Sequence, residues 1–390
     1  MKRSFATQPG LSRSCKTNTL PQNVVLVILN YLKFNDRIDM RLLNHKWCRL
    51  VQSLPIDMKV DDGLVYRIDD VVDFINKFNP LYGHVKFIFN NNKNMGNFCV
   101  SVASSMPNIN VWKVTLSLAF GSDVYTSSDS RNGERFCLFD GIEFSDSIIS
   151  LVLDLDFSRC FDGGFWDAVS RSNISHLSVS NCGVDASCCL LSLSGVTCLD
   201  LIGTYNGFSD PVYSMDLHNL KSLRVFKPDD NFADFMVSHI ESLTYSSHCG
   251  FKDTINTEGL KNILKLSRRI TKITLESFNK QCLSIVNEQC RGVKTLGLYN
   301  PVPCEAGYGL ENLIGMNSLD VLVLGVVGCL PKNFKKEFLN VLPKLSTLKK
   351  VVIMSHESKD CDYSSFVWSI VMYTSVVIEK LERDSPYFYK

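Results

Sequence analysis

The sequence lacks an excess of charge of either sign, because 41 Lys and Arg residues stand against 40 Asp and Glu residues among its 390. A general nucleic-acid-binding surface needs a concentrated excess of Lys and Arg, so this balance argues against that function. The sequence also has no apolar run of the roughly 18 to 20 residues that a membrane-spanning helix needs. The longest candidate is the stretch 366–378, which contains Ser and Thr. We therefore expect no nucleic acid and no membrane among the partners.

Neither a Cys-x-x-Cys pair nor an apolar secretory signal accompanies the 15 cysteines. Disulfides persist in oxidising compartments, so we expect reduced thiols that pack as small hydrophobic residues in a protein of the cytoplasm, the nucleus or both. The densest group of thiols comprises Cys182, Cys188, Cys189 and Cys198. Zinc sites need ligands that converge tetrahedrally, and the expected positions of Cys182 and Cys198 allow only partial convergence. We expect no metal.

Motifs for catalysis are equally scarce. The sequence contains no phosphate-binding GxxxxGK[ST] loop and no HExxH zinc motif. His248 and Cys249 form the only adjacent His–Cys pair, and adjacency in sequence does not provide the geometry that an activated thiol needs. We predict a non-catalytic protein without cofactors, and an enzyme with its residues hidden in loops remains the alternative.

Residues 1–19 are basic, with Lys2, Arg3, Arg13 and Lys16 and no acidic residue. Such a segment is typical either of a mitochondrial presequence or of a short disordered tail. Pro9-Gly10 interrupts any amphipathic helix, which favours the tail.

The next stretch, from Leu20 to Gln52, predicts two helices that are too apolar to stand alone. The first carries apolar residues on nearly every side, so it must be buried on more than one face. About 33 residues cannot enclose so many large side chains by themselves. The excess apolar surface therefore needs another chain or the domain that follows.

This stretch resembles the F-box motif in its Leu20-Pro21 start, its Ile28-Leu29-x-Tyr31-Leu32 core, Asp36, Leu43 and Trp47. The resemblance implies docking onto a Skp-type adaptor and, through it, a cullin scaffold. It departs from the motif at Arg37, where a hydrophobic residue is usual, and at Asn44. The adaptor-binding residues that it implies are Leu20, Pro21, Ile28, Leu32, Ile38, Leu43 and Trp47. A helical cap that only seals the following domain is the alternative.

The rest of the chain repeats one template, apolar-x-x-apolar-x-apolar. Eleven copies run from Tyr82/Val85/Phe87 to Leu348/Val351/Ile353, with a degenerate earlier copy at Met58 and Val60. Their mean step of about 27 residues is typical of leucine-rich repeats. Each copy predicts a short strand whose apolar side chains stack into one continuous core. Between the strands we expect helical or irregular segments such as 256–266, whose buried side carries Leu260, Ile263, Leu264 and Leu266. The irregular, cysteine-tolerant repeats resemble those found behind F-boxes.

The polar residues between these apolar positions are expected on a solvent-exposed face of the sheet. We predict target-binding residues there, because exposed aromatic, Met and charged side chains are what an interaction hot spot needs. They are Arg224, Phe226, Lys272, Glu276, Tyr299 and Met354. Two segments lie outside the pattern: a loop containing 121–133, and the apolar stretch Tyr363 to Thr374, which we expect to close the array as a cap.

The predicted organisation is therefore a basic tail at 1–19, an F-box-like helical module at 20–54 and a leucine-rich-repeat solenoid at 55–390. In fold class this is an α/β horseshoe preceded by a small all-α module. The resemblance implies the substrate-recognition subunit of a Skp–cullin–F-box ubiquitin ligase, with the target protein unknown. The alternative is a leucine-rich-repeat scaffold or protein-interaction module without a ligase role.

Overall fold

The computed structural model divides the chain into two units, Met1–Ile56 and Asp57–Lys390. It describes residues 25, 29, 50, 56–61, 82–89, 95–118, 141–154, 163–180, 193–202, 217–226, 239–246, 255, 257–302, 307–326, 330–355 and 364–380. In the first unit, Val25, Leu29 and Leu50 are helical and at most 7% exposed. The tail at 1–19 and the predicted loop at 121–133 lie outside the described residues.

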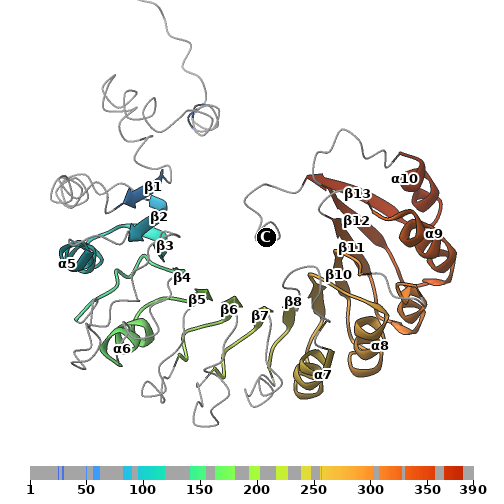
Figure 1. Ribbon diagram of the computed structural model, residues 1–390, viewed down its shortest axis with the longest axis horizontal. Helices are drawn as coiled ribbons and strands as arrows, with labels where there is room; N and C mark the ends of the chain where they lie inside the picture. Colours follow the sequence, from blue (N-terminus) through green and yellow to red (C-terminus); the bar gives the residue numbers. More distant parts are fainter. Residues whose placement is uncertain are drawn as a thin grey trace, which may run out of the picture. The chain divides into compact units, whose positions relative to one another are not determined.

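One sheet organises the described part of the second unit, and its strands follow one another in sequence order (Figure 1). From β2 to β13 the neighbouring strands pair in parallel. The strands are β1 (Ile56–Asp61), β2 (Tyr82–Phe89), β3 (Val111–Leu118), β4 (Ser150–Asp154), β5 (His176–Ser180), β6 (Cys198–Ile202), β7 (Ser222–Phe226), β8 (Ser242–Ser246), β9 (Lys272–Leu275), β10 (Thr295–Tyr299), β11 (Val321–Val326), β12 (Lys350–Ser355) and β13 (Ser375–Lys380).

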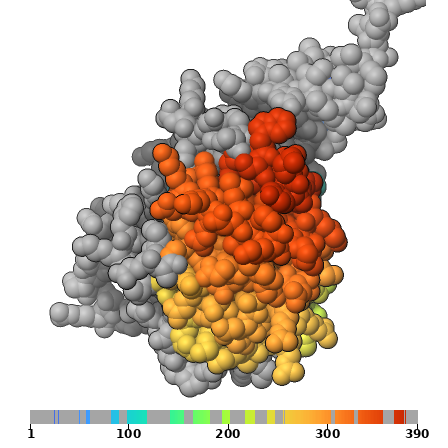
Figure 2. All heavy atoms as spheres, turned by 90° about the vertical axis from the view of Figure 1, so that its right-hand side faces the viewer, coloured from blue at the N-terminus to red at the C-terminus, as the bar shows by residue number. Residues whose placement is uncertain are grey.

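Helices cover one side of this sheet, outside the row of strands (Figure 1). They are α5 (Met95–Ser105), α6 (Gly163–Arg171), α7 (Thr257–Leu266), α8 (Lys280–Gln289), the 3₁₀ helix η5 (Leu310–Gly315), α9 (Lys332–Val341), η6 (Leu342–Lys344) and α10 (Ser364–Val371). Figure 2 shows the side of the C-terminal repeats, where residues coloured yellow to red form a continuous surface in sequence order. The arrangement is a leucine-rich-repeat solenoid, as the sequence predicted.

The strand register confirms the predicted template residue by residue. The middle apolar position aligns across the sheet, as in Leu177 opposite Leu199 and Leu296 opposite Leu322. Both side chains of each pair are at most 2% exposed. The third apolar position aligns in the same way, and these two rows with the position three residues earlier form the core between sheet and helices. Burial of aligned Leu, Ile and Val side chains, worth about 1.5–3 kcal/mol each, is the main stabilising contribution.

Three details of the prediction were wrong. The stretch Tyr363 to Thr374 does not end the array, because β13 follows it and pairs with β12 in register. Leu266, expected in the core with the apolar face of α7, is 42% exposed at the end of that helix. Ser178 and Thr274, expected on an open sheet face, are only 4% and 7% exposed. Parallel register sets Ser178 between Val152 and Asp200, and Thr274 between Thr244 and Gly297, so residues of both neighbouring strands flank each of these short side chains.

None of the helices in the described part of the chain is long and apolar enough to cross a membrane.

Candidate functional site

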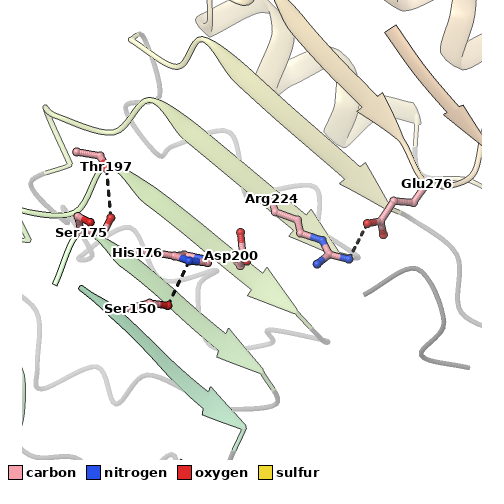
Figure 3. A network of polar contacts seen from close by, with 7 residues as sticks. All are labelled: Ser150, Ser175, His176, Thr197, Asp200, Arg224 and Glu276. Atoms are coloured by element: carbon pink, nitrogen blue, oxygen red, sulfur yellow. Dashed lines mark hydrogen bonds and ion pairs between the residues drawn. The ribbon is translucent and has the colours of Figure 1, made fainter. Parts of the chain in front are cut away.

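The sheet face opposite the helices carries polar side chains in rows, because parallel pairing places equivalent repeat positions side by side. One row contains Ser150, His176, Cys198 and Ser222, in β4 to β7. The next row contains Ser178, Asp200, Arg224, Thr244 and Thr274, in β5 to β9. Figure 3 shows several of these side chains pointing toward one another across the strands.

Arg224 and Glu276 form an ion pair across this face. The guanidinium Nη2 of Arg224 in β7 donates to Oε1 of Glu276, the residue after β9, over 2.6 Å. The pair therefore bridges β8, whose Thr244 lies between as the register partner of both Arg224 and Thr274. The side chains are only 14% and 9% exposed. Burial raises the pKa of Glu276 despite the opposing effect of Arg224.

Tyr299 and Met354 also meet across an intervening strand. The Tyr299 hydroxyl in β10 donates to the thioether sulfur of Met354 in β12, 3.0 Å away. Its ring crosses Gly325 of β11, where a Cβ atom would lie 2.1 Å from the ring carbon Cε1. Gly325 thus provides the space in which the ring lies flat on the sheet. Tyr299 is consequently 5% exposed, so the expectation of an exposed tyrosine was wrong.

The structure thus brings four of the six predicted target-binding residues together in two pairs. Within each pair the two side chains contact each other instead of extending into open solvent. Glu276 is 7% exposed and belongs to the buried set. Lys272 is exposed at the start of β9, whereas Phe226 and Met354 are half-buried. Whether these six residues bind a target stays a prediction.

A second polar group on this face comprises His176, Cys198 and Asp200. Nε2 of His176 lies 3.1 Å from Oδ2 of Asp200, and its Nδ1 lies 3.3 Å from Oγ of Ser150. Hydrogen bonds to Asp200 and to Cys198 raise the pKa of His176 to about 10, against the opposing effect of burial. The donor atoms of the three residues all lie within 4.8 Å of one another.

Sequence reasoning missed this group, because it looked for ligands close together along the chain. His176 and Cys198 are separated by a whole repeat, yet each directly precedes the middle apolar residue of its strand. Comparison of equivalent repeat positions could have found the pair. Cys182, Cys188 and Cys189, which drew attention by their spacing, lie outside the described residues.

His84 in β2 occupies the repeat position equivalent to that of His176, in a different environment. Its Nε2 lies 2.8 Å from Oγ1 of Thr115 in β3. Burial is the largest cause that lowers the pKa of His84; Lys113 and Lys86 add to the effect and Asp57 opposes it.

A histidine whose folded pKa lies below the unfolded value of about 6.5 takes up protons on unfolding. The contribution of this histidine to the free energy of unfolding is therefore complete at a pH above the unfolded pKa, and it is lost as the pH falls below that pKa. We therefore expect the wild type to lose stability relative to His84→Gln on acidification from pH 7.5 to 5, so that the difference between their free energies of unfolding shifts in favour of the variant. Urea titrations across this range would measure the difference. The exposed His218→Gln serves as control, and equal slopes in His84→Gln and wild type would contradict the prediction.

Apolar side chains also reach solvent at the end of α10. Trp368, Met372 and Tyr373 are 73%, 81% and 56% exposed. The sequence had placed them in a closing cap. Trp368 lies in α10, and Met372 and Tyr373 lie in the turn that leads into β13, so this apolar group is a surface feature of the last repeat.

The predicted adaptor-binding residues all lie outside the described residues. They are Leu20, Pro21, Ile28, Leu32, Ile38, Leu43 and Trp47. Their docking role stays a prediction.

Comparisons with known proteins address the two parts of the chain separately. No curated protein matches the sequence. Among solved structures, that of a TLR13–ssRNA13 complex aligns with 83% of this chain and 50% of that chain, at 13% identity and a TM-score of 0.38. This chain thus spans about half the length of that structure. Residues 18–59 match the family model of the F-box domain. The protein therefore carries an F-box domain, joined to a leucine-rich-repeat solenoid.

Proposed function

We propose that this protein is the substrate-recognition subunit of a Skp–cullin–F-box ubiquitin ligase. The observation that carries the proposal is the F-box match at 18–59, directly followed by a repeat array with an extended face. The F-box would bind a Skp-type adaptor, and the solenoid would bind the target protein. We propose the cytoplasm, the nucleus or both as its compartment.

In this role the chain performs no bond chemistry. It holds a target near the ubiquitin-conjugating enzyme and so raises the effective concentration of target lysines at the reactive thioester. Burial of each large apolar side chain in the adaptor interface contributes about 1.5–3 kcal/mol. Seven such residues exceed 10 kcal/mol before association costs of several kcal/mol, roughly what a stable complex needs.

On the solenoid, we propose that the target contacts the sheet face around β7 to β12. Lys272 and the half-buried Phe226 and Met354 are accessible for contact, whereas Arg224 and Tyr299 support the face from within. Double substitution of Arg224 and Tyr299 should therefore weaken target capture, because it changes the shape of this face.

Co-expression of the chain with a Skp-type adaptor, followed by size-exclusion chromatography, tests the adaptor role. We expect a one-to-one complex. The Leu32→Asp/Trp47→Ala variant should weaken it by roughly a hundredfold or more, because two large apolar contacts are lost.

The exposed Lys336→Ala in α9 is the matched control and should leave the complex intact. A monomer that ignores the adaptor, in wild type and variants alike, would sink the ligase proposal. It would favour a repeat scaffold that does not bind the adaptor because its sequence departs from the F-box motif at Arg37 and Asn44.

A further inference from the structure

The side chains of His176, Cys198 and Asp200 converge on one point from two adjacent strands. Residues two apart along a strand project to the same side, which places Cys198 and Asp200 together on β6. Parallel register then sets His176 of β5 opposite Cys198. Each side chain is half-buried, so the point where they meet is partly open to solvent. An imidazole, a thiol and a carboxylate therefore face one another on the sheet.

This donor set and its spacing suit a zinc-like ion. Zn²⁺ binds sulfur, imidazole nitrogen and carboxylate oxygen at about 2.0–2.3 Å, so tetrahedral donors lie roughly 3 to 4 Å apart. The three donor atoms lie within 4.8 Å of one another, so the widest separation needs to shorten by only about 1 Å to match a tetrahedral zinc site. Mg²⁺ and Ca²⁺ prefer oxygen-only sites, whereas thiolate and imidazole favour the later transition metals.

The histidine also has the outer hydrogen bond that metal-binding histidines use. Ser150 in β4 presents its Oγ to Nδ1 of His176 at 3.3 Å. With Nε2 as the metal ligand, Nδ1–H donates to Ser150 and fixes both the tautomer and the ring orientation. Strand β6 thus supplies two ligands, β5 supplies the third, and β4 supplies the side chain that orients it. All three strands belong to one rigid sheet.

We propose that Nε2 of His176, Sγ of Cys198 and a carboxylate oxygen of Asp200 form a three-ligand site for Zn²⁺ or a similar divalent transition metal. Water occupies the fourth position, on the side open to solvent. The thiolate and the carboxylate balance the two charges of the ion. The site is independent of the proposed ligase role, since it uses residues of the solenoid alone.

Cobalt titration of the reduced, metal-stripped full-length chain tests the site. We expect one equivalent of Co²⁺ with tetrahedral absorption and a thiolate-to-cobalt charge-transfer band, and displacement by Zn²⁺. Cys198→Ser should abolish that band. His176→Gln and Asp200→Asn should each weaken binding by more than about tenfold, and Ser150→Ala by about tenfold, because outer-shell changes alone reach that size.

Two variants control for adventitious binding to the other thiols and histidines. His84→Gln removes the histidine at the equivalent repeat position in β2, and Cys290→Ala removes a buried thiol elsewhere. Both should bind cobalt as the wild type does, with unchanged circular dichroism. The proposal fails if no stoichiometric cobalt binds, or if His176→Gln and Asp200→Asn bind as tightly as these controls.

X-ray absorption of the zinc-loaded wild type needs no variant. We expect one sulfur and three nitrogen or oxygen neighbours around the ion. Two or more sulfurs would assign the bound metal to other cysteines and overturn the proposal.

Discussion

Arg224→Ala is expected to lower the free energy of unfolding by about 3–5 kcal/mol, because it leaves the Glu276 carboxylate buried without its cation. The two side chains are 14% and 9% exposed and 2.6 Å apart, so water cannot replace the guanidinium easily. The bridge also ties β7 to the end of β9 across β8. Urea denaturation followed by circular dichroism would measure the loss.

The pH dependence of this loss separates a stranded charge from a lost packing contact. Without Arg224, the folded pKa of Glu276 should rise further above its ordinary value of 4.5. An acid with a raised folded pKa favours the folded state below the unfolded value and loses that contribution as the pH rises through the folded value. The deficit of Arg224→Ala should therefore shrink between pH 8 and pH 5.

The double variant Arg224→Met/Glu276→Leu is the matched control. Replacement of a buried ion pair by apolar residues of similar size is often neutral or stabilising, so we expect it to recover most of the stability. An equal loss in single and double variants, independent of pH, would show that Arg224 acts by packing alone.

The second large effect is expected from Phe334→Ala in α9, at about 3–5 kcal/mol. The Phe334 ring is 1% exposed. It lies edge-on to Phe278 and Tyr308, with ring centroids 6.2 Å and 5.3 Å away, and is stacked on Phe338 at 6.4 Å. Truncation would leave a cavity between the helix and the ends of the preceding repeats, and aromatic pairing adds to what is lost.

Phe334→Leu keeps most of the volume and should cost clearly less than the alanine variant. Lys336→Ala, exposed on the same helix, should change the free energy of unfolding by no more than about 0.5 kcal/mol. Thermal and urea unfolding of the three variants would rank them. A loss in Phe334→Ala no greater than that in Lys336→Ala would show that the aromatic cluster is not part of the core.

The repeat template predicted most of the sheet, because aligned apolar positions dictate both burial and register. It stopped one strand short. Val376 and Ile378 fit the template and pair with Val351 and Ile353, yet they continue the apolar run that begins at Phe366. Within that run, composition alone does not show where α10 ends and β13 begins.

The polar groups were harder to predict, for a physical reason. The repeat template predicts the face of the sheet on which a side chain lies. It does not predict which residue the side chain contacts, because that depends on how far the side chain extends across the neighbouring strands. Arg224 spans β8 to reach Glu276, and Tyr299 spans β11 only because Gly325 has no side chain. His176 and Cys198 needed the exact register between two strands. Both the register and the reach became visible only in three dimensions.

The sequential order of the strands has a consequence for biosynthesis. From β2 to β12 each strand pairs with the strand made just before it and the one made just after it. When a strand leaves the ribosome, the strand with which it pairs has therefore already emerged. Its own free edge is then covered by the strand of the next repeat. Growth of the sheet can keep pace with translation, because each step closes only the one connection between neighbouring strands. Whenever synthesis pauses, the edge of the most recently made strand stays uncovered until the next repeat has emerged, so this edge is exposed for the longest time.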